Sequence, residues 1–206
     1  MRIHRFTGPL VAAALLCAGV SAQASSVVLV DTAASEVRNG AYAGFYTLSI
    51  DATTLPGMCD DFSTHINVGD SWMATVNTYA DIMGGAGKFG PTVKYNQAGW
   101  LFSLATSASA SDQASIDEAI WKIMDPSGAP TPSTLAGQNY LAMATGGSHD
   151  TFDFTNIMEV VTAIPPSASQ EFLIGPMASV PVPAAAWLFA SGLAGLAGVA
   201  RRRAAR

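Results

Sequence analysis

The sequence predicts an α+β protein: a mainly antiparallel β sandwich or barrel with two short helices packed on it, plus a C-terminal transmembrane helix. Three observations support this. Short segments rich in β-branched and aromatic residues fill the first part of the chain. Two segments with apolar residues three and four positions apart follow them. A charge-free apolar run, residues 184–200, lies near the C-terminus.

Composition divides the chain into five parts. They are a signal peptide (1–24), an extracellular globular domain (25–175), a Pro-rich stalk with a sorting motif (176–183), a transmembrane helix (184–200) and a cytoplasmic arginine tail (201–206). The globular part is long enough to form one domain with its own core.

The expected strands are short, and most alternate between apolar and polar residues. They cover residues 26–30, 45–50, 59–68, 72–76, 152–161 and 172–174. Residues 40–44 are expected to be loose. Thr54-Leu55-Pro56-Gly57 is expected to be a turn, because Pro and Gly favour turns.

The helical segments are recognised by spacing. Residues 95–104 fit one or two helical turns, and 135–144 form a weak helix. A polar break at 111–115 precedes Ser115-x-x-Glu118, which reads as a capping box that starts a helix ending before Pro126. The Gly-rich segment 83–90 is expected to be a loop.

The N-terminus has the pattern of a secretory signal peptide. Arg2 and Arg5 form a basic region, residues 10–20 are apolar, and Ala22-Gln23-Ala24 is an A-x-A cleavage site. Signal peptidase is therefore expected to cut after Ala24. This would leave the body of the protein, residues 25–183, outside the inner membrane.

The C-terminal run is at the lower length limit for a membrane helix, since residues 184–200 cover roughly 25 Å. Arg201, Arg202 and Arg203 would form the membrane stop and keep the C-terminus in the cytoplasm. Trp187 suits the opposite interface. The prolines before the run would end the folded part and present an extended segment, which a processing protease needs.

The tail carries a specific resemblance. It runs Val180-Pro181-Val182-Pro183, then Ala-Ala-x-Trp-Leu-Phe-x-Ser-Gly-Leu, Gly-rich apolar residues and arginines. This resembles a PEP-CTERM sorting signal, with Val182 in place of the glutamate of the name. The resemblance implies a Gram-negative, polysaccharide-producing bacterium. It also implies that an exosortase, a membrane cysteine protease, cuts near Pro181 to Pro183 and releases or re-attaches the protein outside the cell.

The charge of the body limits its partners. Between residues 25 and 183 there are four basic residues and all 15 acidic ones, a net charge of −11, whereas the whole chain carries −5. This argues against nucleic acid as a partner. Asp60, Asp61 and Asp70 could offer oxygen ligands to Ca²⁺, but they lack the spacing of a calcium loop. We expect solvated carboxylates there, with no metal and no cofactor.

Cys59 is the candidate reactive thiol. It is the only cysteine left after signal removal, so an intramolecular disulfide is excluded. A buried structural thiol is the simplest interpretation; a modified or covalently reactive thiol and a protease-like nucleophile are the alternatives. If residues 59–68 form a strand, His65 lies about 20 Å from Cys59. His149, in a Gly-Gly-Ser turn, is expected to be exposed.

The body also has a weaker resemblance. Cys-Asp-Asp-Phe (59–62), Val-Gly-Asp-Ser-Trp (68–72) and Ala-Ile-Trp (119–121) are similar to a group of uncharacterised PEP-CTERM proteins. The body is also distantly similar to the thioester domains of bacterial surface adhesins. Those join a cysteine to a glutamine two residues before Ala-x-Trp. Cys59 matches the cysteine, but Asp117 occupies the glutamine position, so a Cys–Gln thioester is not expected.

We interpret the chain as an exported surface or extracellular-matrix protein, associated with biofilm exopolysaccharide and without catalytic activity of its own. Its expected partners are exosortase, signal peptidase, the membrane and exopolysaccharide, and no nucleic acid. The alternative is an adhesin-like binding module, and the weakest is a Cys-dependent hydrolase. Trp72, Trp100 and Trp121 could stack on sugar rings, but their apolar neighbours favour a place in the core.

Overall fold

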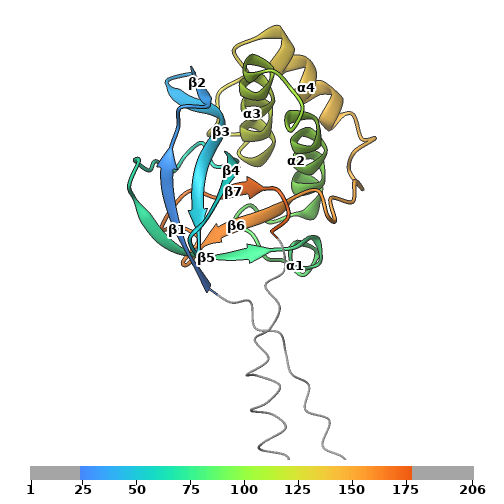
Figure 1. Cartoon of the computed structure of the whole chain (residues 1–206). Coiled ribbons are helices and arrows are strands. Elements are labelled where there is room, and N and C mark those ends of the chain that lie inside the picture. Colours follow the sequence, from blue (N-terminus) through green and yellow to red (C-terminus); the bar gives the residue numbers. More distant parts are fainter. Residues whose placement is uncertain (1–23, 178–206) are drawn as a thin grey trace, which may run out of the picture.

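The computed structural model describes residues 24–177. Seven strands and four helices alternate in groups along this part of the chain (Figure 1). They are β1 (Ala24–Asp31), β2 (Ser35–Arg38), β3 (Ala41–Ile50), β4 (Thr53–Cys59), β5 (Ser71–Asn77), α1 (Tyr79–Met83), α2 (Thr92–Ala105), α3 (Ala110–Met124), α4 (Leu135–Thr145), β6 (Glu159–Ala163) and β7 (Phe172–Ile174).

Six of the strands close into an antiparallel barrel. The order is β1-β5-β6-β7-β4-β3, and a further pairing between β1 and β3 joins the two ends. β2 extends the sheet beyond this ring by pairing with the first half of β3. The α+β class with antiparallel strands is thus confirmed, as a barrel. Two packed helices were expected, and the described chain has four: the weak helix expected at 135–144 is present as α4, whereas α1 was not expected.

Alternation along the strands creates two separate cores. Leu48, Ile50 and Phe172 point into the barrel, where side chains fill the interior as in other small barrels. Val160 and Leu173, on the opposite faces of β6 and β7, pack against the helices. The helices therefore cover one side of the barrel (Figure 1). The helical spacing seen in the sequence is confirmed, since all its core positions are buried: Tyr95, Ala98, Leu101, Phe102, Ile116, Ala119, Ile120 and Ile123.

The predicted turn at 54–57 is wrong, because these residues belong to β4. Pro56 is tolerated there because β7 pairs with β4 only from Gly57 onward, so the missing N–H of Pro56 breaks no ladder bond on that side. Gly57 is required by close approach, since a Cβ there would lie 2.6 Å from Leu48 Cδ1. The predicted strand 59–68 is also wrong: the strand ends at Cys59, and a loop follows.

The start of α3 was placed too late in the sequence. The N-cap is Ser109, whose side chain accepts the N–H of Asp112, and the predicted polar break lies inside the helix. Ser115 instead bonds back to the carbonyl of Ser111. Ser109-x-x-Asp112 offers the same capping chemistry six residues earlier.

The predicted strand at 152–161 exists only from Glu159 onward. Its apolar residues are nevertheless in the core: Phe154 is fully buried and packs on Gly99 of α2. Asn156 has a positive φ of 59°, which interrupts an extended chain. The sequence pattern thus predicted correctly that this segment contributes to the core, but the extended backbone predicted for its first half was wrong.

Several expectations fall outside the described residues. They are the signal region before Ala24, the motif Val180 to Pro183, the apolar run 184–200 and the arginines Arg201, Arg202 and Arg203. Among the helices of residues 24–177, none has the length and apolar character needed to cross a membrane.

Candidate functional site

One thiol and two carboxyl side chains at the end of β4 and just after it lie in the interior. Cys59, Asp60 and Asp61 are at most 1% exposed. Their loop lies between the barrel, α3 and the Gly-rich loop before α2. The expectation of solvated carboxylates was therefore wrong for Asp60 and Asp61, whereas Asp70 is exposed. Within residues 24–177, no group of three His, Cys, Asp or Glu side chains has the arrangement of a metal site.

Cys59 is held from two sides. Its carbonyl accepts the indole N–H of Trp121 at 2.8 Å, and its thiol donates to the carbonyl of Asp61 at 3.3 Å. Burial, followed by the negative charges of Asp117 and Asp60, raises the pKa of the Cys59 thiol well above its usual value. A buried thiol that stays protonated is a poor nucleophile.

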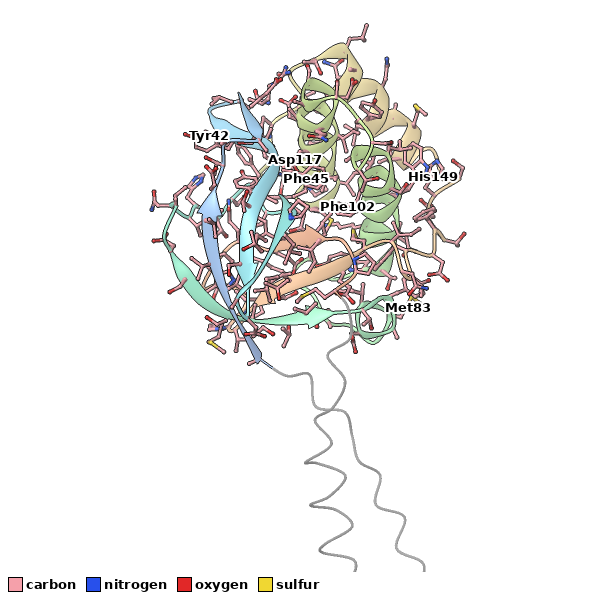
Figure 2. All side chains as sticks on the ribbon, in the orientation of Figure 1. Tyr42, Phe45, Met83, Phe102, Asp117 and His149 are labelled. Atoms are coloured by element: carbon pink, nitrogen blue, oxygen red, sulfur yellow. The ribbon has the colours of Figure 1, made fainter. Side chains whose placement is uncertain are left out.

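Asp117 lies on the inner side of α3, next to the barrel (Figure 2). Its Oδ2 accepts the backbone N–H of Gly44 at 2.8 Å, while Oδ1 has no hydrogen-bond partner in the described part of the chain. Burial raises the pKa of Asp117, against the effect of the Gly44 bond. Gly44 has a φ of +107°, a backbone conformation that favours glycine. Asp117 is near enough to Cys59 to raise the pKa of its thiol. The structure therefore brings together the two positions that correspond to the cysteine and the glutamine of thioester domains.

Asp60 and Glu171 form a pair of neighbouring carboxyls, and both residues are 0% exposed. Glu171 accepts three donors: Tyr95 Oη at 2.6 Å, Thr162 Oγ1 at 2.5 Å and the backbone N–H of Lys88 at 2.9 Å. Neither oxygen of Asp60 has a hydrogen-bond partner within residues 24–177, although the two carboxyls are close enough to perturb each other's pKa.

The proton of this pair belongs on Asp60. Burial raises the pKa of both groups, and the charge of Glu171 raises that of Asp60 further. The three donors to Glu171 act in the other direction, because hydrogen bonds stabilise the charged form of a carboxyl. The arrangement that costs least is therefore a neutral Asp60 beside a charged Glu171 that accepts three hydrogen bonds from the protein.

Asp61 and Lys88 form a partly buried ion pair. The Lys88 ammonium bonds to Asp61 Oδ2, to Thr64 Oγ1 at 2.9 Å and to the carbonyl of Ser169 at 3.3 Å. The side chains of Asp61 and Lys88 are 1% and 18% exposed. Of the two ion pairs in residues 24–177, the other joins Arg38 to Glu36 near the surface.

Neither His65 nor His149 is hydrogen-bonded to the thiol of Cys59. His65 is exposed and lines a pocket of 160 Å³ with Tyr46 and Gln170. His149 is only partly exposed, because its ring stacks on Trp100 with 3.8 Å between ring centroids, at the outer edge of the helical layer (Figure 2). In the described chain, the thiol of Cys59 bonds only to the backbone of Asp61.

The tryptophans are mainly packing residues, as expected. Trp121 is 1% exposed and its ring contacts Phe62 with 5.1 Å between centroids. Trp72 and Trp100 are half-buried, and Trp72 stacks on Phe172.

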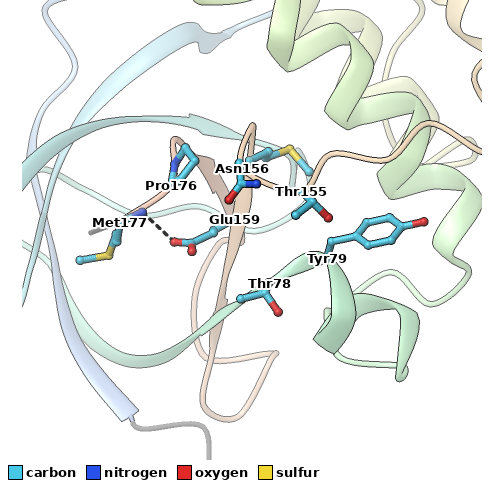
Figure 3. Close-up of a pocket in the computed structure, with 8 residues that line it drawn as sticks. Thr78, Tyr79, Thr155, Asn156, Glu159, Pro176 and Met177 are labelled. Carbon is cyan, nitrogen blue, oxygen red and sulfur yellow. Dashed lines mark hydrogen bonds between the residues drawn. The ribbon is translucent and has the colours of Figure 1, made fainter. Parts of the chain in front are cut away.

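A pocket of 270 Å³, lined by polar and apolar residues alike, lies where the described chain ends (Figure 3). Glu159 Oε2 accepts the backbone N–H of Met177 at 3.0 Å. Thr78, Thr155 and Asn156 complete the polar lining. The hydrogen bond fixes the last described residue to the start of β6.

Sequence reasoning missed Lys88 and Glu171. Each gave a weak signal: Lys88 is one of only four basic residues in the body and lies in a Gly-rich loop, and Glu171 directly precedes the apolar run Phe172 to Ile174. Their partners lie 27 and 76 positions away, at Asp61 and Tyr95. No local pattern reports contacts of that separation.

The burial of Cys59 predicts slow chemistry. In a protein without residues 1–24, a thiol reagent should label native Cys59 at least about 100-fold more slowly than in denaturant, because labelling requires local opening that costs a few kcal/mol. Cys59→Ser provides the blank. Equal labelling rates with and without denaturant would show that the thiol is accessible.

Comparisons of the chain with models of known protein families, with curated proteins and with solved structures find no match.

Proposed function

We propose that this chain is an exported protein of the cell surface or extracellular matrix, sorted by an exosortase and without catalytic activity of its own. The observation that carries the proposal is the tail: Val180-Pro181-Val182-Pro183, an uncharged apolar run and Arg201 to Arg203. In this proposal signal peptidase releases the N-terminus. The tail holds the precursor in the membrane until the exosortase cuts it, and exopolysaccharide surrounds the product.

The positions of the two ends of the body support this proposal. Ala24, the first residue of β1, pairs with Thr75 of β5. Met177 lines the same pocket as Thr78, which follows β5. Both ends therefore leave the body near one strand, at the lower end in Figure 1. A body attached at one end can stand on a membrane surface without refolding, and a cut after Ala24 removes only the first residue of β1.

The interior chemistry supports a non-catalytic role. Cys59, the candidate nucleophile, is buried and protonated and bonds only to the backbone within the described chain. A nucleophile needs a nearby base and access to substrate. The carboxyl of Asp117 bonds to the backbone of Gly44 and so joins α3 to the barrel.

The sorting motif is tested by Pro181→Ala combined with Pro183→Ala in the native host. We expect the wild-type protein to lack its arginine tail and to be found outside the inner membrane, because the prolines keep the cleavage segment extended. The double variant should keep its C-terminus at Arg206 and stay in the membrane fraction. Intact mass by cell fraction measures both outcomes.

Pro166→Ala is the matched control, because this exposed proline lies in the loop after β6. It should be processed as wild type. Wild-type protein that still ends at Arg206 would overturn the sorting proposal, and so would normal processing of the double variant.

A further inference from the structure

We propose that Lys88 and Asp61 form an intramolecular amide bond, an isopeptide cross-link between the Lys88 side-chain nitrogen and the Asp61 side-chain carbonyl carbon. The reacting groups already touch, because Lys88 Nζ contacts Asp61 Oδ2 in the interior. They come from different segments: the loop after β4 and the Gly-rich loop before α2.

Both groups are held in a reactive orientation. Asp61 Oδ1 accepts the backbone N–H groups of Ser63 and Thr64, each at 3.2 Å. Thr64 Oγ1 and the carbonyl of Ser169 occupy the other N–H directions of Lys88, so its remaining direction faces the carboxyl. Folding has therefore already met the entropic cost of bringing amine and acid together.

The two N–H groups on Oδ1 also suit the transition state. When the nitrogen attacks Cγ, negative charge develops on the oxygen that stays behind. Backbone N–H donors aimed at that oxygen stabilise the charge, as in an oxyanion hole. Oδ2, which contacts Lys88, is then the oxygen that leaves.

A proton donor is adjacent. Asp60 directly precedes Asp61 in the chain, is fully buried, and has no hydrogen-bond partner for either oxygen in the described chain. Burial and the charge of Glu171 raise the pKa of Asp60, so it carries a proton. This carboxyl can give one proton to the leaving oxygen and take one from the nitrogen.

The reaction balances without any other reagent. The Lys88 ammonium passes one proton to Oδ2, which leaves a neutral amine beside a neutral acid. The nitrogen attacks Cγ, the C–N bond forms, and the C–Oδ2 bond breaks. Through Asp60 a second proton moves from nitrogen to oxygen, and one water departs. The product replaces the buried charge of Asp61 and the partly buried charge of Lys88, which are costly to keep out of water, with a neutral amide.

The cross-link would close a loop from Asp61 to Lys88. The mature body has one cysteine and can form no internal disulfide. An amide between side chains supplies the same kind of constraint on the unfolded chain. It also resists reduction.

A tryptic digest of the full chain, unfolded after purification, tests the bond. Cleavage after Arg38, Lys88 and Lys94 normally releases a fragment covering residues 39–88. An acylated Lys88 is not cleaved, so we expect a fragment covering 39–94 that is lighter by one water. Lys94 and Lys122, whose ammonium groups bond to backbone carbonyls, are cleaved in the same digest and act as internal controls.

Two substitutions make the result specific. Lys88→Arg keeps the cation and the ion pair but cannot be acylated, so cleavage should return at position 88 with no loss of water. Asp61→Asn should lose one ammonia instead and give the same product mass. A wild-type fragment 39–88 of full mass would overturn the proposal, and so would a loss of water that persists in Lys88→Arg.

Discussion

Replacing Trp121 with alanine should lower the free energy of unfolding by about 3–5 kcal/mol, the largest loss expected from any single substitution in the body. The side chain is 1% exposed and lies where α3 meets the barrel and the loop after β4. Its loss leaves a large cavity beside Phe62. It also leaves the carbonyl of Cys59 without its donor, which adds a buried unsatisfied group. Urea denaturation followed by circular dichroism measures the change.

Two variants separate packing from hydrogen bonding. Trp121→Phe keeps much of the apolar volume and loses the indole N–H, so a loss of about 1–3 kcal/mol is expected. Trp100→Ala is the matched control, because Trp100 is half-buried and stacks on His149 at the outer edge of the helices. Its loss should be clearly smaller. Equal losses for Trp121→Ala and Trp100→Ala would show that Trp121 does not hold this junction together.

The sequence predicted the structure best where apolar residues recur with a regular period and their side chains are buried in the core. Ile116, Ala119, Ile120 and Ile123 repeat at helical spacing, and all are buried. The strands β1, β3 and β5 were placed for the same reason, because alternate residues enter the barrel. In each case a local period reports which face is buried.

Prediction failed where distant partners decide the structure. Pro56 and Gly57 read as a turn, but pairing with β3 and β7 makes them a strand. Asp60 and Asp61 read as solvated acids, but Glu171, Lys88 and Gln170 lie around them. The capping box at Ser115 is chemically sound, but Ser109 offers the same chemistry six residues earlier, and the helix begins there.

A short motif marked Cys59 as the candidate thiol, and the same resemblance drew attention to Asp117 as the residue in the place of the glutamine. In the structure the two residues lie near each other, and Asp117 contributes to the raised pKa of Cys59. The structure also shows that Asp117 bonds to Gly44 of β3, a contact across 73 positions that no spacing rule predicts. Motifs therefore located the residues, and only the fold shows their environment.

The buried carboxyls should make the protein less stable as the pH rises from 5 to 8. Burial raises the pKa of Asp117 and of Asp60 in the folded state, while in the unfolded chain an aspartate titrates near about 3.9. Above that value the folded state binds more protons than the unfolded state. Stability is therefore complete below the unfolded pKa and is lost as the pH rises toward the folded pKa. This is opposite to the usual behaviour of ion-paired carboxyls.

Asp117→Asn tests this origin directly. The amide oxygen can still accept the N–H of Gly44, but the residue no longer titrates. The melting temperature of the variant should fall less between pH 5 and 8 than that of the wild type, and at pH 8 the variant should be the more stable protein. Asp153→Asn is the control: hydrogen bonds from Thr155 lower the pKa of this exposed aspartate, so it is ionised throughout the range. A wild-type melting temperature that stays constant or rises toward pH 8 would mean that Asp117 is ionised in the folded protein. Its carboxylate would then need a donor for Oδ1 beyond those of residues 24–177, which leave that oxygen unpaired.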